Sequence, residues 1–331
     1  MVSIEQCRAM PKVELHVHLE GSIRPQTLIR LAEKNKVALP ADTVEGLAEW
    51  YRFRDFPHFV EIYTAVSSCI RTPEDIEFVA TEFLQGQAEQ NILWSEATYT
   101  AGTIAKESGI PLDEQLGALG EAMVYGHEQL GIHMGLIIDI VRGWPVDYAM
   151  EVADWAIRSM GRGVVALGLS GIEGVGQTAP YAEVFALAER AELPIVPHAG
   201  ETQGAYSIWD ALEYTGCQRI GHGIRCLEDK ELVRELRRRG TVLEVCPTSN
   251  ICLTPIPDLG HHPIAEMHDL GLAVTINSDD PPMFGTTLSD EFARCSAAFG
   301  WDGQTLSGLI RTAAESSLCP ERDTLTARVS Q

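Results

Sequence analysis

Short apolar segments alternate with amphipathic segments along the whole chain. The apolar segments are rich in Val and Ile and end in small or polar residues, a pattern typical of buried strands. We therefore predict eight strands, at residues 13–19, 92–100, 133–141, 164–171, 194–201, 219–224, 241–250 and 273–280. Amphipathic helices are predicted between them, at residues 27–34, 73–90, 113–130, 146–160, 181–191, 207–214, 229–239 and 264–270.

This alternation of strands and helices predicts an α/β fold. Runs such as GLIIDIV at residues 135–141 are almost entirely apolar, so both faces of these strands are expected to be covered, as in parallel sheets. Eight strand–helix units that close on themselves form a (β/α)8 TIM barrel. The chain has no Pro-, Gly- or Ser-rich linker and no break in composition, which indicates a single domain over residues 1–331.

Two regions add to this repeating pattern. Residues 35–68 insert extra helical segments, at 44–51 and 56–67, between the first two predicted strands. Long insertions at such positions are often functional, and we expect this one to form a lid. One or two closing helices are expected after residue 292, and the polar end at residues 324–331 is a candidate for disorder.

Composition and charge narrow the class of protein. The chain of 331 residues is 45% hydrophobic and 22% charged, which is typical of a globular protein and excludes disordered, collagen-like and coiled-coil classes. The 25 basic and 47 acidic residues give a formal charge of −22, which repels nucleic acids and anionic membrane surfaces alike. A small molecule is therefore the expected partner, and the oligomeric state stays open.

The termini and cysteines indicate a cytoplasmic location. The first residues, MVSIEQCRAMPK, lack the basic start and apolar stretch of an export signal, and no apolar run approaches the ~20 residues that span a membrane. The eight cysteines are scattered, with no C-x-x-C pair, so we expect reduced and mostly buried thiols.

Ionisable side chains gather at the ends of the predicted strands. His16 and His18 are two residues apart on a strand and therefore project from the same face, into the barrel. The others at or near strand ends are His198, Glu201, His222, Asp279 and Asp280. Because TIM barrels build their active sites at the carboxyl ends of the strands, we expect these groups to form one site.

The residue types indicate a metal. His16, His18 and His198 offer neutral nitrogen and Asp279 offers oxygen, a set that suits zinc first and iron, manganese or cobalt as substitutes. Zinc would lower the pKa of a bound water to ~7 and make it a nucleophile, while His222 and Glu201 remain free to move protons. The residues thus predict hydrolysis at an electrophilic carbon. A buried polar network without metal is the alternative.

Six strings carry a resemblance to a known family. They are PKVELHVHLEGS (11–22), LGLSG (167–171), HAGE (198–201), RIGHG (219–223), EVCPTSN (244–250) and TINSDDPPMFGTTLSDEF (275–292). Together and in this order they resemble the adenosine deaminase family of the amidohydrolase superfamily. The resemblance implies that one zinc ion is held by His16, His18, His198 and Asp279. No lysine lies in the fourth predicted strand to bridge a second metal, so a single ion is expected.

The resemblance also implies roles for the remaining residues. His222 would orient or deprotonate the zinc-bound water, assisted by Asp279. Glu201 would protonate ring N1 as hydroxide adds to C6 of an adenine ring and ammonia leaves. Asp280 would hold N7, and the backbone N–H of Gly171 would contact N3. The implied reaction is the conversion of adenosine or deoxyadenosine to inosine or deoxyinosine.

Departures from the family pattern leave the substrate open. Glu20 stands where adenosine-specific relatives carry the Asp that contacts the ribose 5′-hydroxyl, and adenine deaminases also tend to carry Glu there. Gly168 and Ile172 stand where relatives often have Asp. The string DDPPMF resembles the nucleoside enzymes more than the adenine enzymes. A 5′-modified adenosine such as aminodeoxyfutalosine, or free adenine, therefore remains an alternative to adenosine.

Two further hypotheses stay open. A related barrel with the same metal could hydrolyse a lactone, amide or phosphoester, in which case no ammonia would be released. A binding protein could retain the pocket without catalysis, although it would need neither Glu201 nor His222. The aromatic residues of the insertion, Phe56, Phe59 and Tyr63 among them, fit either the sugar side of the pocket or the core. His262 is expected to lie in a solvated loop, outside the site.

Overall fold

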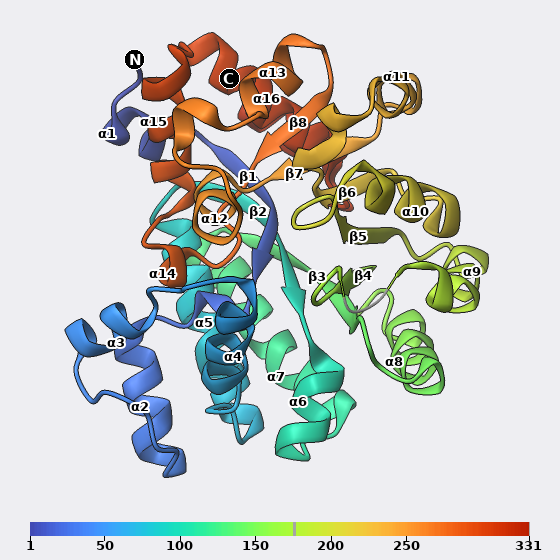
Figure 1. The fold of residues 1–331 in the computed structure, drawn as a ribbon. Coiled ribbons are helices and arrows are strands. Elements are labelled where there is room, and N and C mark those ends of the chain that lie inside the picture. The colour runs from blue at the N-terminus through green and yellow to red at the C-terminus, as the bar shows by residue number, and fades with distance from the viewer. Residues whose placement is uncertain (175–176, 331) are drawn as a thin grey trace.

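The protein is a barrel of eight parallel strands, as Figure 1 shows. The computed structural model describes residues 1–174 and 177–330. The strands pair in chain order and are β1 (Lys12–His18), β2 (Ile92–Tyr99), β3 (His133–Val141), β4 (Val164–Ser170), β5 (Ile195–Ala199), β6 (Arg219–His222), β7 (Val242–Val245) and β8 (Ala273–Ile276). Each strand lies parallel to its neighbours, which confirms the predicted (β/α)8 TIM barrel.

The ring closes between β8 and β1 through the segment that follows β8. The backbone N–H of His18 donates to the carbonyl oxygen of Asp279 at 2.9 Å, and the N–H of Asp279 donates to the carbonyl of His16 at 3.1 Å. Below them, Asn277 Oδ1 accepts from the N–H of Leu15 at 3.0 Å. The closing contacts are therefore made by the residues that carry the predicted ligands, rather than by a regular ladder.

Helices surround the strands on the outside (Figure 1). Those before β5 are α1 (Ile4–Ala9), α2 (Pro25–Asn35), α3 (Val44–Trp50), α4 (Phe56–Ser67), α5 (Pro73–Ala88), α6 (Ala101–Ser108), α7 (Leu112–Tyr125), α8 (Val146–Arg158) and α9 (Ala182–Arg190). Those after β5 are α10 (Ala205–Thr215), α11 (Lys230–Arg239), α12 (Pro247–Leu253), α13 (Ile264–Asp269), α14 (Pro281–Phe284), α15 (Leu288–Phe299), α16 (Gly303–Ser316) and α17 (Arg322–Val329).

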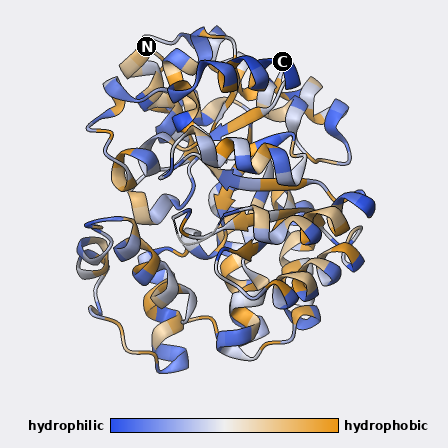
Figure 2. Ribbon diagram, turned by 45° about the vertical axis from the view of Figure 1, so that its right-hand side comes forward, coloured by the Kyte–Doolittle hydropathy of each residue, from blue (hydrophilic) through white to orange (hydrophobic). Residues whose placement is uncertain are grey.

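The strands are buried on both faces, as their continuous apolar pattern predicts. Every residue of β1, β2, β5, β6 and β7 is buried. Figure 2 shows these hydrophobic strands at the centre and mixed polar and apolar helices around them. Among the described helices, none is long and apolar enough to cross a membrane.

The insertion after β1 is helical, and its α4 has the predicted bounds. Asp55 caps α4, because its side chain accepts from the backbone N–H of His58 at 2.9 Å. The ring of Phe59 stacks on Phe284 of α14 with centroids 5.5 Å apart, and Phe53 also meets Phe284 edge-on. These aromatic contacts hold α4 over the carboxyl ends of the strands. Whether the insertion moves as a lid stays a prediction.

Several segments differ from the predicted elements, and α1 and α6 lie where no helix was predicted. The seventh and eighth strands end at Val245 and Ile276, and the residues that follow turn into α12 and α14, which begin at prolines. Proline fits the first turn of a helix and has no N–H for a strand ladder. The predicted disordered tail instead forms most of α17, because Leu325 and Val329 are buried against the core. Gln331 lies outside the described residues.

Candidate active site

A pocket of about 150 Å³ opens at the carboxyl ends of the strands, beneath α4. Its lining contains the predicted site residues His18, Glu20, Gly171, His198, Glu201, His222, Asp279 and Asp280. His16, which is 2% exposed, lies directly behind them. The barrel has thus brought together all the residues that the sequence proposed for the site, although they are up to 264 positions apart.

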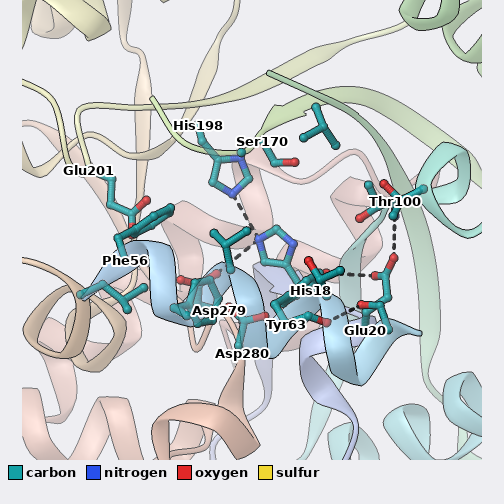
Figure 3. A pocket seen from close by; sticks show the side chains of 18 of the residues that line it. His18, Glu20, Phe56, Tyr63, Thr100, Ser170, His198, Glu201, Asp279 and Asp280 are labelled. Atoms are coloured by element: carbon teal, nitrogen blue, oxygen red, sulfur yellow. Dashed lines mark hydrogen bonds and ion pairs between the residues drawn. The ribbon is translucent and has the colours of Figure 1, made fainter. Parts of the chain in front are cut away.

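Three imidazoles and one carboxylate converge on a small volume. His18 Nε2 lies 3.2 Å from His198 Nε2 and 3.3 Å from Asp279 Oδ1 (Figure 3). His16 Nε2 lies 3.5 Å from the same carboxylate oxygen. Burial lowers the pKa of His18 to about 4 and that of His198 well below its usual value, so both rings are neutral. Neutral imidazoles are the form that binds metal ions.

Hydrogen bonds on the far side of two rings turn their Nε2 atoms toward this volume. Burial disfavours the charged ring of His16, but the carboxylates of Asp279 and Glu244 outweigh it and raise the pKa of His16 to about 10, so a metal ion would take the place of the proton on its Nε2. His16 Nδ1 lies 3.0 Å from Glu244 Oε2, and His198 Nδ1 lies 3.1 Å from the carbonyl oxygen of Leu169. A carboxylate or carbonyl only accepts, so each Nδ1 carries the ring proton. His16 Nε2 is buried and has no hydrogen-bond partner. Metal-ligating histidines usually donate their other ring N–H to a carboxylate or a backbone carbonyl, as His16 and His198 do here. The set of donor atoms therefore fits a divalent ion.

The same volume holds three further ligand-type groups, His222, Cys246 and Glu201. Within the described residues, three triads have ligand atoms within 4.8 Å of one another: His16, His198 and His222; His16, Cys246 and Asp279; and Glu201, His222 and Asp279. Sequence analysis did not single out Cys246. Burial raises the pKa of this thiol well above its usual range, so it is a neutral neighbour of the imidazoles rather than a thiolate.

Two site residues have unusual backbone conformations. His222 has φ 62° and Asp279 has φ 64°, in the left-handed region that non-glycine residues rarely occupy. Each such residue costs about 1–3 kcal/mol and persists only where the surroundings enforce it. Gly221 shows how tight the packing is, because a Cβ there would lie 2.6 Å from His16 Cε1. The first glycine of RIGHG, Gly221, therefore lets β6 pass close to the imidazole of His16.

Burial and nearby negative charge favour the protonated form of two carboxyl groups in the pocket. Burial raises the pKa of Glu201 well above its usual value, and the charges of Asp279 and Glu173 add to the effect. Burial, followed by the adjacent Asp279 carboxylate, also raises the pKa of Asp280 well above its usual value. Asp280 Oδ1 is buried without a hydrogen-bond partner. A carboxyl group in its protonated form donates a hydrogen bond, so both groups are candidate donors to a ligand.

Glu173 organises the loop that carries Glu201. One carboxylate oxygen accepts from the backbone N–H of Gly200 at 2.7 Å. The other accepts from the N–H of Glu201 at 3.1 Å, of Thr202 at 2.6 Å and of Gln203 at 3.0 Å. These bonds outweigh the effect of burial and lower the pKa of Glu173. Sequence analysis missed this residue, because no string shows which backbone groups a side chain will reach.

Glu20 lies at the opposite wall of the pocket and is 1% exposed. Its Oε1 accepts from the backbone N–H of Thr100 at 2.9 Å, and its Oε2 accepts from the hydroxyl of Tyr63 in α4 at 3.3 Å (Figure 3). The next residue is Gly21, where a Cβ would collide with Oδ1 of Asp280. The glycine of the string LEGS therefore lets the segment that carries Glu20 pack directly against Asp280.

The departure at Gly168 has a structural counterpart on the neighbouring strand. A Cβ at Gly168 would lie 1.8 Å from Oδ1 of Asp139, so the carboxyl group of this β3 residue fills the space of a β4 side chain. Asp139 is fully buried, and burial raises its pKa to about 7. An acidic group is thus present beside β4, although the position where relatives carry it is glycine.

A family model described as adenosine deaminase matches residues 11–330 of this chain, which is nearly its whole length. The chain belongs to the adenosine deaminase family. Membership confirms the resemblance and makes the protein a metal-dependent hydrolase of the amidohydrolase type, which deaminates adenine-type substrates.

The relatives of this family member carry two different names. An adenine deaminase from Rhizobium leguminosarum is 36% identical over 97% of this chain and 99% of its own length. An aminodeoxyfutalosine deaminase from Streptomyces coelicolor is 37% identical over 93% of this chain and 80% of its own.

Solved structures share the barrel. An adenine deaminase from Arthrobacter aurescens has a TM-score of 0.92 at 30% identity, covering 97% of this chain and 98% of that one. An amidohydrolase from Burkholderia ambifaria, solved with bound Zn, has a TM-score of 0.88 at 25% identity, covering 97% and 88%. Both structures match 97% of this chain, so this deaminase shares their fold over nearly its whole length.

His262 is buried beside this site, although the sequence predicted that it would lie in a solvated loop. His262 is only 3% exposed, and its Nε2 lies 3.2 Å from Oδ1 of Asn250. The side-chain nitrogen of Asn250, Nδ2, lies 3.1 Å from Nδ1 of His222. His262 is therefore a buried neighbour of the active site of this deaminase, not a residue of a solvated loop.

Proposed function

We propose that this protein hydrolyses the 6-amino group of a 5′-modified adenosine, giving the 6-oxo nucleoside and ammonia. The placement of two buried carboxyl groups, Glu201 and Asp280, in one pocket with the proposed metal ligands carries this proposal. A 6-aminopurine presents acceptor nitrogens at N1, N3 and N7, and the pocket offers donors in Glu201, Asp280 and the N–H of Gly171. Glu201 would face N1, Gly171 N3 and Asp280 N7.

A single zinc ion is the proposed cofactor. His16, His18, His198 and Asp279 would hold it, since their ligand atoms converge and His16 Nε2 has no hydrogen-bond partner. When bound, such an ion lowers the pKa of a coordinated water to about 7 and supplies a nucleophile at neutral pH. The bound Zn in the Burkholderia ambifaria structure supports zinc over other divalent ions.

The side chains of the pocket divide the proton transfers between them. Water adds its oxygen to C6, and Asp279 accepts the proton that this oxygen loses, with His222 beside it. Glu201 gives its proton to N1, so the ring carries no negative charge when C6 becomes tetrahedral. The proton taken up by Asp279 then passes to the 6-amino group, and ammonia leaves as the C6–N bond breaks. The C6 hydroxyl gives its proton back to Glu201, which restores both side chains and leaves the 6-oxopurine. The burial that keeps Glu201 protonated makes it available for this step.

The wall opposite the reacting carbon supports a substituent at the 5′-position. Both oxygens of Glu20 already accept hydrogen bonds from the protein, which weakens their use for a free 5′-hydroxyl. The wall contributed by α4 includes Phe56, Phe59 and Val60, which suit an apolar group. The aminodeoxyfutalosine deaminase at 37% identity also supports a 5′-modified nucleoside.

Free adenine is the second candidate. The adenine deaminase from Rhizobium leguminosarum matches over the whole length of both chains, which supports the base alone as substrate. The pocket volume of about 150 Å³ lies below the ~300–1,000 Å³ usual for drug-sized ligands. A small planar base fits this volume while α4 stays in place.

A substrate panel tests the proposal. The zinc-loaded enzyme is assayed for ammonia release with adenine, adenosine, 2′-deoxyadenosine, 5′-deoxyadenosine and aminodeoxyfutalosine. We expect the highest kcat/KM with a 5′-modified nucleoside, and a preference for adenine would establish the second candidate instead. Release of ammonia from none of them would contradict both.

The variant Glu20→Asp refines this test. The shorter side chain leaves room at the sugar side, so we expect the kcat/KM ratio of adenosine to 5′-deoxyadenosine to rise by up to about tenfold, the value of one hydrogen bond. The rate with adenine, which has no sugar, is the internal control and should change little. An unchanged nucleoside ratio would place the sugar elsewhere.

A further inference from the structure

A buried chain of hydrogen bonds runs from a backbone amide to His222. It begins at the backbone N–H of Ile264, the first residue of α13, which lies 3.2 Å from His262 Nδ1. His262 Nε2 lies 3.2 Å from Asn250 Oδ1. Asn250 Nδ2 in turn lies 3.1 Å from His222 Nδ1. The three side chains are at most 3% exposed, so water does not compete for these contacts.

The direction of every bond in this chain follows from its first member. A backbone N–H can only donate, so His262 Nδ1 must accept and carries no proton. Burial lowers the pKa of His262 to about 3, so its ring is neutral and the single proton is on Nε2. That proton is donated to Asn250, which fixes the amide with its oxygen toward His262 and its NH2 group toward His222.

The last bond then determines the tautomer of His222. Asn250 donates to His222 Nδ1, so this nitrogen is the acceptor and the neutral ring carries its proton on Nε2. In His16 and His198 the opposite holds, because Nδ1 donates to a carboxylate or carbonyl and Nε2 is the atom that faces the proposed metal. The barrel therefore presents two imidazoles as ligands and one, His222, as a hydrogen-bond donor.

We infer that Asn250 and His262 are positioning residues that hold His222 as the Nε2–H tautomer, a donor to the attacking water rather than the base that deprotonates it. This inference rests on the proposed function for its reaction and names the direction of one hydrogen bond in it. His222 Nε2 lies 3.9 Å from Asp279 Oδ2 and 3.7 Å from Glu201 Oε2, too far for direct bonds. A water oxygen between them can accept from His222 and give its own proton to Asp279.

A histidine at this place can either donate a hydrogen bond to the attacking water or accept a proton from it. A donor at His222 Nε2 aligns a lone pair of the water oxygen with C6 and leaves its O–H directed at Asp279. An acceptor at the same atom would compete with Asp279 for that proton. The proton lost by water therefore goes to the Asp279 carboxylate, and His222 keeps the same number of protons throughout the addition.

Nitrogen NMR of the zinc-loaded holoenzyme, labelled with ¹⁵N in its histidine rings, tests the tautomer without substrate. We expect a protonated Nε2 and an unprotonated Nδ1 for His222, assigned by loss of its signals in His222→Gln. In Asn250→Asp the carboxylate only accepts, so the His222 pattern should reverse. Observation of the Nδ1–H form in the unmodified enzyme would overturn the inference, whatever the enzyme deaminates.

Kinetics with the best substrate of the panel provide the second measurement. Asn250→Asp and His262→Phe should lower kcat by about 10²-fold, the contribution typical of a positioned proton-handling group, with KM changed little and zinc content unchanged. The matched control is His261→Phe, the exposed neighbour, which should keep the normal kcat. Normal kcat in Asn250→Asp with a reversed tautomer would also overturn the inference. If one variant fails to fold, the other variant and the spectrum of the unmodified enzyme decide.

Discussion

At the scale of single residues, burial decides the chemistry of each carboxyl group in the pocket. Glu201 and Asp280 line one pocket with Asp279 and are almost fully buried, so burial and the nearby negative charge raise the pKa of both. Glu173, only 28 positions before Glu201, meets four backbone N–H groups and keeps its charge. Side chains of the same type thus favour the protonated or the ionised form according to their partners.

Substitution of Glu201 tests the proton donor directly. Glu201→Gln keeps the shape and the burial but has no acidic proton for the ring, so we expect kcat to fall by about 10²–10⁴-fold. Ammonia release and zinc content are measured together, because the proposed ligands are untouched and zinc should stay near one per chain. Glu213→Gln, on the exposed face of α10, is the control. Normal turnover of Glu201→Gln would exclude the assigned role.

At the scale of elements, the turn after β5 is shaped by a side chain from the end of β4. Glu173 accepts from four consecutive backbone N–H groups and from the hydroxyl of Ser207. Arg142 from the end of β3 donates to the carbonyl oxygen of His198 at 2.6 Å. The proposed metal ligand and the proposed proton donor on this turn are thus held by two neighbouring strands.

Glu173→Gln should therefore act on catalysis through Glu201. The amide cannot accept from all four N–H groups, so we expect kcat to fall by about tenfold or more, with KM affected less. In the Glu201→Gln background the same change should add little, since residues that act as a unit are not additive. Fully additive losses in this double-mutant cycle would show that Glu173 contributes only to folding.

The insertion after β1 is fastened by a second buried carboxylate, Asp75 in the first turn of α5. It accepts from Lys34 Nζ at 2.6 Å and Asn35 Nδ2 at 2.7 Å. It also accepts from the backbone N–H groups of Arg71 and Thr72, both at 3.0 Å. Burial alone would raise its pKa, but these bonds lower it overall. One side chain therefore ties α2 to the start of α5.

This lowered pKa gives the stability a defined pH dependence. A folded pKa below the unfolded value of about 3.9 stabilises the protein above that pH, and the contribution is lost as the pH falls through the folded pKa. Asp75→Asn should lower the free energy of unfolding at pH 7 by about 2 kcal/mol. In urea unfolding the difference from the unmodified protein should narrow below about pH 4. Glu77→Gln, which is exposed, should show no such narrowing.

The sequence predicts the barrel and its ring of ionisable residues well, since both depend on local patterns. Strand periodicity placed His16 and His18 on one inward face, and the ends of apolar runs located His198 and His222. What periodicity does not contain is the distance between side chains from different strands. Glu173, His262 and the Asp139 carboxyl beside Gly168 act through such contacts, so only the folded chain reveals them.

At the scale of the whole molecule, the proposed metal would link the first strand of the barrel to the segment that follows the last strand. Its ligands would come from β1, from β5 and from the segment after β8, where β8 meets β1 through only a few backbone bonds. A ligand that binds only the folded state stabilises it, by about 2.7 kcal/mol at a hundred times its dissociation constant. The ion is therefore expected to support the ring closure as well as the reaction.

Metal removal tests this expectation. Dialysis against a chelator should abolish ammonia release and lower the melting temperature by several degrees, and stoichiometric zinc should restore both. Magnesium, which prefers oxygen ligands, should restore neither and is the matched control. Full activity in protein shown by elemental analysis to hold no metal would contradict the assignment.

The left-handed backbones at His222 and Asp279 set a limit on how heat-resistant this enzyme can become. Glycine would adopt both conformations without strain, so a search for thermotolerant variants that scores only survival would favour it there. Such variants would keep the barrel and lose two of the groups proposed to act in the reaction. Selection for durability and selection for turnover thus oppose each other at these two positions, and durable versions of the enzyme have to gain their stability elsewhere in the molecule.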